Sequence, residues 1–240
     1  LICDASCNPI WVYREAKDRI GLDDLLDRTF LLPASHVVRR EAYQNVRFDE
    51  SIAGYEDSAG WAELAARGVT WAVTPPPVAR YRIRPGSASK ASVSMMRDAA
   101  IVFPRMFELA RTQGGDPALL DIREQAVMRR LAISHACRGA VLAPDQAEEF
   151  ASLFAGDDDP PVNARELTTT GFFSVLYGLG EWPFYDARAP ARWAAGLVKL
   201  WDLWAHRGAI EPDVARQARA SLARPLYNKP DVHELMGVAA

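Results

Sequence analysis

Apolar residues are spaced differently in the two parts of the chain, with a change near residue 90. Residues 1–90 hold short apolar and β-branched runs between short helical patterns, whereas residues 91–240 repeat apolar residues at helical spacing over long stretches. Runs of the first kind predict strands, and spacing of the second kind predicts amphipathic helices. We therefore predict an α/β unit over residues 1–90, followed by a mainly α-helical region over residues 91–240.

Within the first unit, apolar and β-branched runs predict three strands, at residues 31–38, 69–73 and 78–84. The first strand should lead into a helix at Arg39-Arg40-Glu41. A second helix is expected over residues 58–67 and should end at Gly68, because glycine readily adopts the left-handed conformation that follows a helix. Pro75-Pro76-Pro77 separates the last two strands, and Pro85-Gly86 fits a type II turn.

The second region is expected to consist of helices whose ends are marked by glycine and proline. Their predicted bounds are 93–113, 117–140, 144–154, 171–180, 191–206 and 212–223. The helix at 191–206 carries an apolar stripe on one face: Trp193, Leu197, Leu200, Trp201 and Trp204. We interpret the stripe as core. Attachment to a membrane surface is the alternative, against which Asp202 on the polar side argues.

The composition, with 49% hydrophobic and 25% charged residues, is that of an ordinary globular protein. A net charge of −3 gives no basic field for nucleic acid. No apolar run approaches the ~20 residues that span a bilayer, so we expect no transmembrane segment. The three cysteines and four histidines show no ligand-spaced pairs, which indicates reduced thiols and no metal site. We expect a cytoplasmic protein, with peripheral attachment to the inner face of the membrane as an alternative.

Two acidic residues, Glu56 and Asp57, come just before the helix predicted at 58–67. The partial positive charge of a helix N-terminus favours ionised carboxylates. We therefore expect Asp57 to be deprotonated near neutral pH, unless burial raises its pKa. An ionised carboxylate fixed at the end of a rigid element has the properties of a general base. The alternative is that Asp57 or Ser58 only caps the helix.

The strand predicted at 78–84 carries Arg82 and Arg84, which should point to the same side. Two guanidinium groups on one side can bind phosphate oxygens, and the turn that follows adds the hydroxyls of Ser87 and Ser89. The alternative is a solvated edge strand that ends in a hairpin turn.

The order of these motifs resembles the second half of a family-2 glycosyltransferase domain. In that family an Arg-bearing helix is followed by a Gly-Phe-Asp-Glu turn, a Glu-Asp motif heading a helix that ends in Arg-x-Gly, and a Tyr-Arg-x-x-x-x-Ser-x-Ser segment. The matching segments here are Arg39-Arg40-Glu41, Phe48-Asp49-Glu50, Glu56-Asp57, 61–68, Tyr81-Arg82 and Ser87-Ala88-Ser89. The match covers residues 29–90. Val46-Arg47 replaces the usual Gly-Gly, and Ser58 stands where an aromatic residue is common.

The resemblance implies a GT-A fold and an inverting transfer of a sugar from a nucleotide-sugar donor to an acceptor hydroxyl on a carbohydrate, lipid or protein. It implies that Asp57, beside Glu56, is the general base. A divalent cation, magnesium or manganese, and basic residues would stabilise the departing diphosphate. For the basic residues we assign Arg82 and Arg84, with Ser87 beside them.

Two further residues are candidates for the acceptor side of the site, His36 and Trp61. His36 lies just before the double arginine, in a zone that lines the acceptor side in the resembled fold. The alternative is a structural or surface histidine. Trp61 is a candidate for stacking on a sugar ring, and its alternative role is to pack the helix onto the sheet.

The donor half of such a domain, with its Asp-x-Asp metal motif after a strand, is not seen before Asp57. Asp23-Asp24 is interpreted as a pair of helix N-terminal acids, and Asp157-Asp158-Asp159 as a solvated loop. We therefore expect the main ligands of the cation to lie outside this chain, which also lacks an initiator methionine. The chain is expected to be a fragment of a longer enzyme or a degenerate domain. The alternative function is a non-catalytic helical module that binds or scaffolds a partner.

Overall fold

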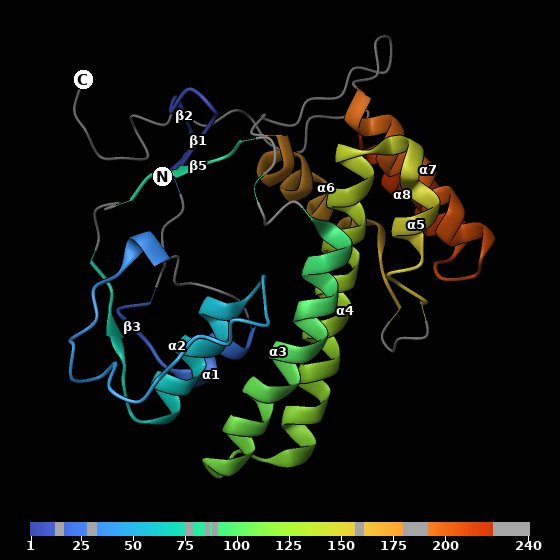
Figure 1. Cartoon of the computed structure of the whole chain (residues 1–240). Coiled ribbons are helices and arrows are strands. Elements are labelled where there is room, and N and C mark those ends of the chain that lie inside the picture. Colours follow the sequence, from blue (N-terminus) through green and yellow to red (C-terminus); the bar gives the residue numbers. More distant parts are fainter. Residues whose placement is uncertain are drawn as a thin grey trace.

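The computed structural model describes residues 1–12, 17–27, 33–74, 79–84, 87, 91–156, 161–179 and 192–222 (Figure 1). Short strands and two helices, α1 (Leu22–Asp27) and α2 (Glu56–Ala66), lie on one side of the long helices α3 (Ser92–Thr112) and α4 (Pro117–Leu142). Helices α5 (Ala147–Ala151), α7 (Arg192–His206) and α8 (Pro212–Leu222) lie on the other side of α4, whereas α6 (Ala164–Leu179) lies beside the upper end of α4 on the same side as the strands. At this level the predicted fold class, an α/β part followed by a mainly helical region, agrees with the structure.

The described strands are short and form two separate sheets. In the first, β1 (Ile2–Cys3) pairs antiparallel with β2 (Pro9–Trp11) and parallel with β5 (Tyr81–Arg82). In the second, β3 (Arg19–Ile20) pairs antiparallel with β4 (Trp71–Ala72). β4 and β5 confirm, in shortened form, the strands predicted at 69–73 and 78–84. The mixed first sheet therefore has β5 at one edge.

The strand predicted at 31–38 is wrong over the residues that the structure describes. Residues Pro33–Ser35 form a 3-10 helix instead, and no strand follows it before residue 39. Pro33 lacks the N–H that a strand ladder needs. Val37 is 95% exposed, so its branched side chain has no core to pack against.

The helix predicted at Arg39-Arg40-Glu41 is also wrong. The chain makes consecutive turns there, in which the N–H of Ala42 bonds to the carbonyl of Arg39 and that of Tyr43 to Arg40, three residues earlier. Such bonds close tight turns, whereas an α-helix needs bonds four residues apart.

Helix α2 begins two residues before the predicted start and ends as predicted. Gly68 has a φ of +90°, and its N–H bonds to the carbonyl of Ala65, while the N–H of Val69 bonds to Leu64. This pair of bonds is the Schellman arrangement that closes a helix through a left-handed glycine. The glycine therefore fixes the exit of the helix that carries Glu56 and Asp57.

The helices predicted in the second region are present. They comprise α3, α4, a 3-10 turn at Pro144–Gln146 that leads into α5 (Ala147–Ala151), α6 (Ala164–Leu179), α7 (Arg192–His206) and α8 (Pro212–Leu222). The helix predicted at 171–180 starts earlier, at Ala164. The interpretation of the 191–206 stripe as core is confirmed, because all five of its residues are buried: Trp193, Leu197, Leu200, Trp201 and Trp204.

One hydrophobic core extends across the predicted boundary at residue 90. It joins residues from α1, α2 and β4 to residues of α3 and α4, among them Leu26, Leu64, Phe103 and Val127. The division into two domains at residue 90 stays a prediction. Across this boundary, α2 packs directly on α3. The helical region therefore forms part of the surroundings of Glu56 and Asp57.

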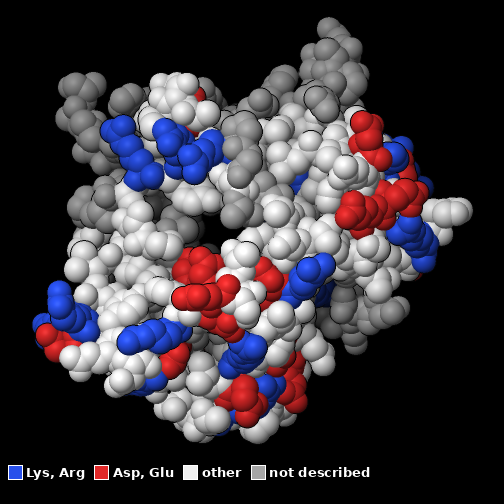
Figure 2. Space-filling model, in the orientation of Figure 1, with Lys and Arg blue, Asp and Glu red and all other residues white. Residues whose placement is uncertain are grey.

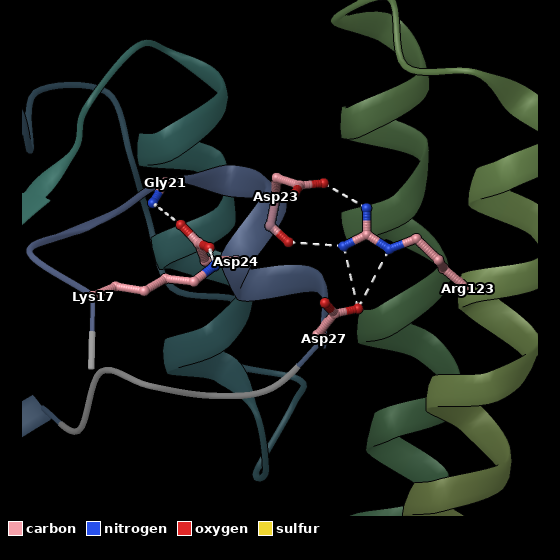
Figure 3. A network of polar contacts seen from close by, with 6 residues as sticks. All are labelled: Lys17, Gly21, Asp23, Asp24, Asp27 and Arg123. Carbon is pink, nitrogen blue, oxygen red and sulfur yellow. Dashed lines mark hydrogen bonds and ion pairs between the residues drawn. The ribbon is translucent and has the colours of Figure 1, made fainter. Parts of the chain in front are cut away.

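Charged contacts also join α1 to α4. Arg123 of α4 forms ion pairs with Asp23 and with Asp27, and its guanidinium donates to the main-chain carbonyl of Asp23 at 2.9 Å (Figure 3). On the same short helix, Asp24 accepts the N–H of Gly21 at 2.9 Å and pairs with Lys17. Asp23 and Asp24 lie in the first turn of α1, as predicted.

Several predictions fall on residues outside the described part of the chain: Pro75-Pro76-Pro77, Pro85-Gly86, Ser89 and the loop at 157–159.

In the parts that are described, no helix has both the length and the apolar character that crossing a membrane requires.

Candidate functional site

A pocket of about 440 Å³ lies between the irregular segment at 33–48 and the start of α2. It brings together His36, Glu56, Asp57 and Trp61, which were all predicted as site residues from the sequence. Four further residues line it: Pro33, Val38, Tyr43 and Phe48. The pocket therefore combines two carboxylates and an imidazole with an aromatic wall.

The first turn of α2 places the two acids. Tyr55 is the N-cap residue, with a left-handed φ of 64° and no side-chain cap, so neither Asp57 nor Ser58 occupies the N-cap position. Asp57 does satisfy a free donor of the first turn, because its Oδ1 accepts the N–H of Ser58 at 2.7 Å. The capping alternative is thus wrong in position, although Asp57 stabilises the helix start.

Burial raises the pKa of Asp57, and the neighbouring Glu56 carboxylate raises it further, while the hydrogen bond from the Ser58 N–H opposes both. The sequence led us to expect an ionised Asp57 unless burial intervened, and burial does intervene. A carboxylate whose pKa is raised holds a transferred proton better than one in water. An increase in the pKa of a carboxylate is the shift that favours its use as a general base.

Trp61 lies at the centre of the aromatic wall and is only 3% exposed. Its ring contacts His36 at a centroid distance of 4.2 Å, Phe48 at 5.9 Å and Tyr43 at 6.1 Å, all close to perpendicular. Trp61 also packs edge-on against Trp71 of β4. The packing role predicted for Trp61 is confirmed.

The indole N–H of Trp61 is buried and has no hydrogen-bond partner among the residues that the structure describes. Buried N–H donors are seldom left unpaired, because desolvation without a partner costs about 1–3 kcal/mol. Trp61 lines the pocket, but its indole nitrogen has almost no accessible surface, so the N–H lies within the packed wall.

Two helices of the second region hold the turn that precedes the acids. The N–H of Gly54 donates to Oδ2 of Asp98 on α3 at 2.8 Å, and Asp98 is buried. The Tyr55 hydroxyl and Nε2 of His135 on α4 are hydrogen-bonded at 2.8 Å. The backbone next to Glu56 and Asp57 is thus positioned by residues far away in the sequence.

Burial shifts the pKa values of the Tyr55–His135 pair in opposite directions. It raises the pKa of Tyr55 to about 12 and, together with Arg138, lowers that of His135 to about 3. Both side chains are therefore neutral at physiological pH. A neutral pair can stay buried without the desolvation cost of a charge.

Arg82, Arg84 and Ser87 do not line the pocket. Arg82 and Arg84 are exposed while Ile83 between them is buried, which confirms that the two arginines share a side. The hydroxyl of Ser87 donates to the carbonyl of Arg84 at 3.1 Å. Figure 2 shows basic side chains over the three-stranded sheet and acidic ones near the centre of the same face. Both interpretations of the arginines, phosphate binding and a solvated edge strand, stay open.

The donor set for a divalent cation is incomplete in the described residues. They contain no group of three or more His, Cys, Asp or Glu placed to hold a metal. Magnesium binds through carboxylates with near-octahedral oxygen ligands, and the pocket lining offers only Glu56 and Asp57. These residues therefore do not fit a complete cation site, and the chemistry below is derived without one.

Sequence reasoning missed Tyr43, Phe48, Asp98 and His135. Phe48 was noted only as part of a turn motif, and nothing in the sequence marked Tyr43. Asp98 and His135 left a signal, because each is a polar residue on the apolar face of a predicted helix and so needed a buried partner.

In three comparisons with known proteins, no family model, no curated protein and no solved structure matches this chain.

Proposed function

We propose that the pocket is the acceptor site of an inverting glycosyltransferase, with Asp57 as the general base. The observation that carries the proposal is the pocket itself, which assembles His36, Glu56, Asp57 and Trp61 around about 440 Å³. This volume lies in the range of about 300–1,000 Å³ that is usual for small-ligand sites. The motif order that resembles family-2 glycosyltransferases supplies the reaction class.

The reaction is a single displacement. An acceptor hydroxyl donates its hydrogen bond to Asp57, and its oxygen attacks the anomeric carbon of the nucleotide-sugar. The new C–O bond forms as the bond to the diphosphate breaks, the proton passes to Asp57, and the electron pair leaves with the diphosphate. Attack from the side opposite the leaving group inverts the anomeric configuration. Burial favours the proton transfer because it raises the pKa of Asp57.

The remaining predicted residues have supporting roles in this proposal. Glu56 and His36 orient the acceptor from the pocket wall, and Trp61 forms part of the aromatic wall against which the sugar packs. Arg82, Arg84 and Ser87 contact the donor diphosphate. Their place outside the pocket is compatible with this role, because the leaving group of an in-line displacement lies away from the base.

A GT-A arrangement and a nucleotide-sugar donor belong to the same proposal. The mixed sheet β2–β1–β5 gives only coarse support for such a fold. The cation implied by the resemblance would need ligands beyond the residues that the structure describes.

A second candidate is a module that binds a saccharide without transferring it. The observation that favours it is the separation of the pocket from Arg82 and Arg84, since the pocket lining contains no arginine or lysine that could bind a diphosphate. The two candidates share the acceptor site and differ only in turnover.

The test measures oligosaccharide binding and the release of nucleoside diphosphate from nucleotide-sugars, with the whole chain. Asp57→Asn should keep saccharide binding and reduce turnover by about 100-fold or more. Asp49→Asn is the matched control, because Asp49 is paired with Arg105 and does not line the pocket. Near-normal turnover of Asp57→Asn would refute the base assignment. Saccharide binding without any turnover in the unaltered chain favours the second candidate.

A further inference from the structure

We propose that the acceptor bound in this pocket carries a protonated amine, and that it is an amino sugar whose ammonium group lies against Glu56 and Asp57. The inference rests on the proposed function and deepens it, since it names the class of acceptor. It is carried by two features of the pocket: its charge and its aromatic wall.

The charge of the pocket is one-sided. Glu56 and Asp57 are adjacent, and the lining includes no lysine or arginine. Within the described residues, neither carboxylate forms an ion pair, whereas the nearby acids Asp49 and Glu63 are paired with Arg105 and Arg67. Two adjacent carboxylates without a cation repel each other in a partly dry site. A ligand that brings one positive charge would relieve this repulsion.

A cation alone would leave part of the pocket unsatisfied. The two carboxylates accept hydrogen bonds and donate none, and together they offer more acceptor sites than the three N–H groups of one ammonium group can fill. Sugar hydroxyls can donate to the remaining carboxylate sites. The complementary ligand therefore combines hydroxyl groups with an amine, which is the chemistry of an amino sugar.

The aromatic wall suits the same ligand. Tyr43, Phe48 and Trp61 pack edge to face, so that ring surfaces of differing orientation border the pocket. Aromatic faces attract cations within about 6 Å, by about 0.5–1 kcal/mol at exposed sites and more when the cation is desolvated. They also cover the apolar C–H face of a pyranose ring. Phe48 is 44% exposed, which leaves its ring accessible to a ligand.

The test compares three trisaccharides of equal length by titration calorimetry with the whole chain. They are the β-1,4-linked trimers of glucosamine, of N-acetylglucosamine and of glucose. We expect the glucosamine trimer to bind about ten-fold more tightly than either uncharged trimer, a difference of about 1.4 kcal/mol. Equal affinities for all three would overturn the inference and leave the proposed function standing. Failure of all three to bind would overturn both.

Neutral substitutions distinguish the effect of the carboxylate charges from a general disruption of the pocket. Glu56→Gln should reduce the preference for the glucosamine trimer over the glucose trimer to about two-fold or less. Glu63→Gln is the matched control on the same helix, because Glu63 pairs with Arg67 and does not line the pocket. Thermal unfolding shows whether Glu56→Gln is folded. If it is not, the preference for the glucosamine trimer is measured with Asp57→Asn instead. A preference that survives both neutral substitutions would overturn the inference.

Discussion

The hydroxyl of Tyr55 and Nε2 of His135 lie 2.8 Å apart and are hydrogen-bonded, although 80 positions separate the two residues in the sequence. Tyr55 is the N-cap residue of α2, and His135 lies in the C-terminal half of α4. The helical region thereby contacts the backbone that positions Asp57. This contact gives the second region a structural role in the proposed site.

The His135 contact predicts a loss of stability in mild acid. The pKa of His135 is lowered to about 3 in the folded protein, whereas an unfolded histidine titrates near about 6.5. Between these values the unfolded chain binds more protons, so the free energy of unfolding decreases as the pH falls from 6.5 towards 3. The loss by pH 4 should be on the order of 3 kcal/mol.

Urea denaturation at pH 7, 5.5 and 4 measures this dependence. His135→Gln should cost about 1–2 kcal/mol at pH 7 through the lost hydrogen bond, and should flatten the acid limb of the profile. His206→Gln is the control, since His206 is exposed at the end of α7 and should leave the profile unchanged. An unaltered acid limb in His135→Gln would contradict the assignment of the dependence to His135.

The helical region was the more predictable part of the fold, because its ends carry local signals. Gly114, with a φ of +87°, follows α3, and the Asp116 side chain caps α4 by accepting the N–H of Ala118. The start of α6 was misplaced although a signal existed. The Asn163 side chain accepts the N–H of Glu166 at 3.0 Å, a cap that the sequence analysis overlooked.

The sequence predicted some of the residues that line the pocket, but not Tyr43 and Phe48 in its wall or the contacts that hold it in place. The motif order identified Glu56, Asp57, His36 and Trp61, and all four line one pocket. The strand expected before His36 does not form, so the structure reaches the same juxtaposition by irregular turns. No local pattern could reveal the bond between Gly54 and Asp98, which joins residues 44 positions apart and depends on how α3 packs.

Gly60 controls the position of Phe48 in the pocket wall. A Cβ added at Gly60 would lie 2.8 Å from Cε1 of Phe48, so Gly60→Ala should push the exposed ring outward. Because alanine favours a helix over glycine by about 1 kcal/mol, the free energy of unfolding should change little. Saccharide affinity, measured by calorimetry, should fall about five-fold or more.

Gly178→Ala is the matched control for this change. An added Cβ at Gly178 in α6 meets its nearest atoms at 3.7 Å, which is ordinary contact. This variant should leave saccharide affinity unchanged. Equal effects of the two variants on binding would show that Phe48 has no part in the wall.

Arg123 should contribute measurably to the attachment of α1 to α4. Its side chain is 21% exposed and contacts Asp23 and Asp27 together (Figure 3). Arg123→Met keeps most of the apolar stem and removes the charged contacts, so it should lower the free energy of unfolding by about 1–2 kcal/mol. Arg216→Met should change it by less than about 0.5 kcal/mol, because that arginine is 71% exposed and its partner Asp213 is exposed as well. Denaturant titrations measure the free energy of unfolding of both variants, and equal losses in the two would contradict this prediction.

The hydrogen bond from the Gly54 N–H to the buried Asp98 also makes that amide a natural spectroscopic reporter. A backbone proton held by a buried carboxylate exchanges slowly with deuterium, and its chemical shift depends on the exact length of the bond. Gly54 lies next to Tyr55, so a ligand that presses on the first turn of α2 would displace it. Occupancy of the pocket could thus be followed from a single glycine resonance, without any label on the ligand.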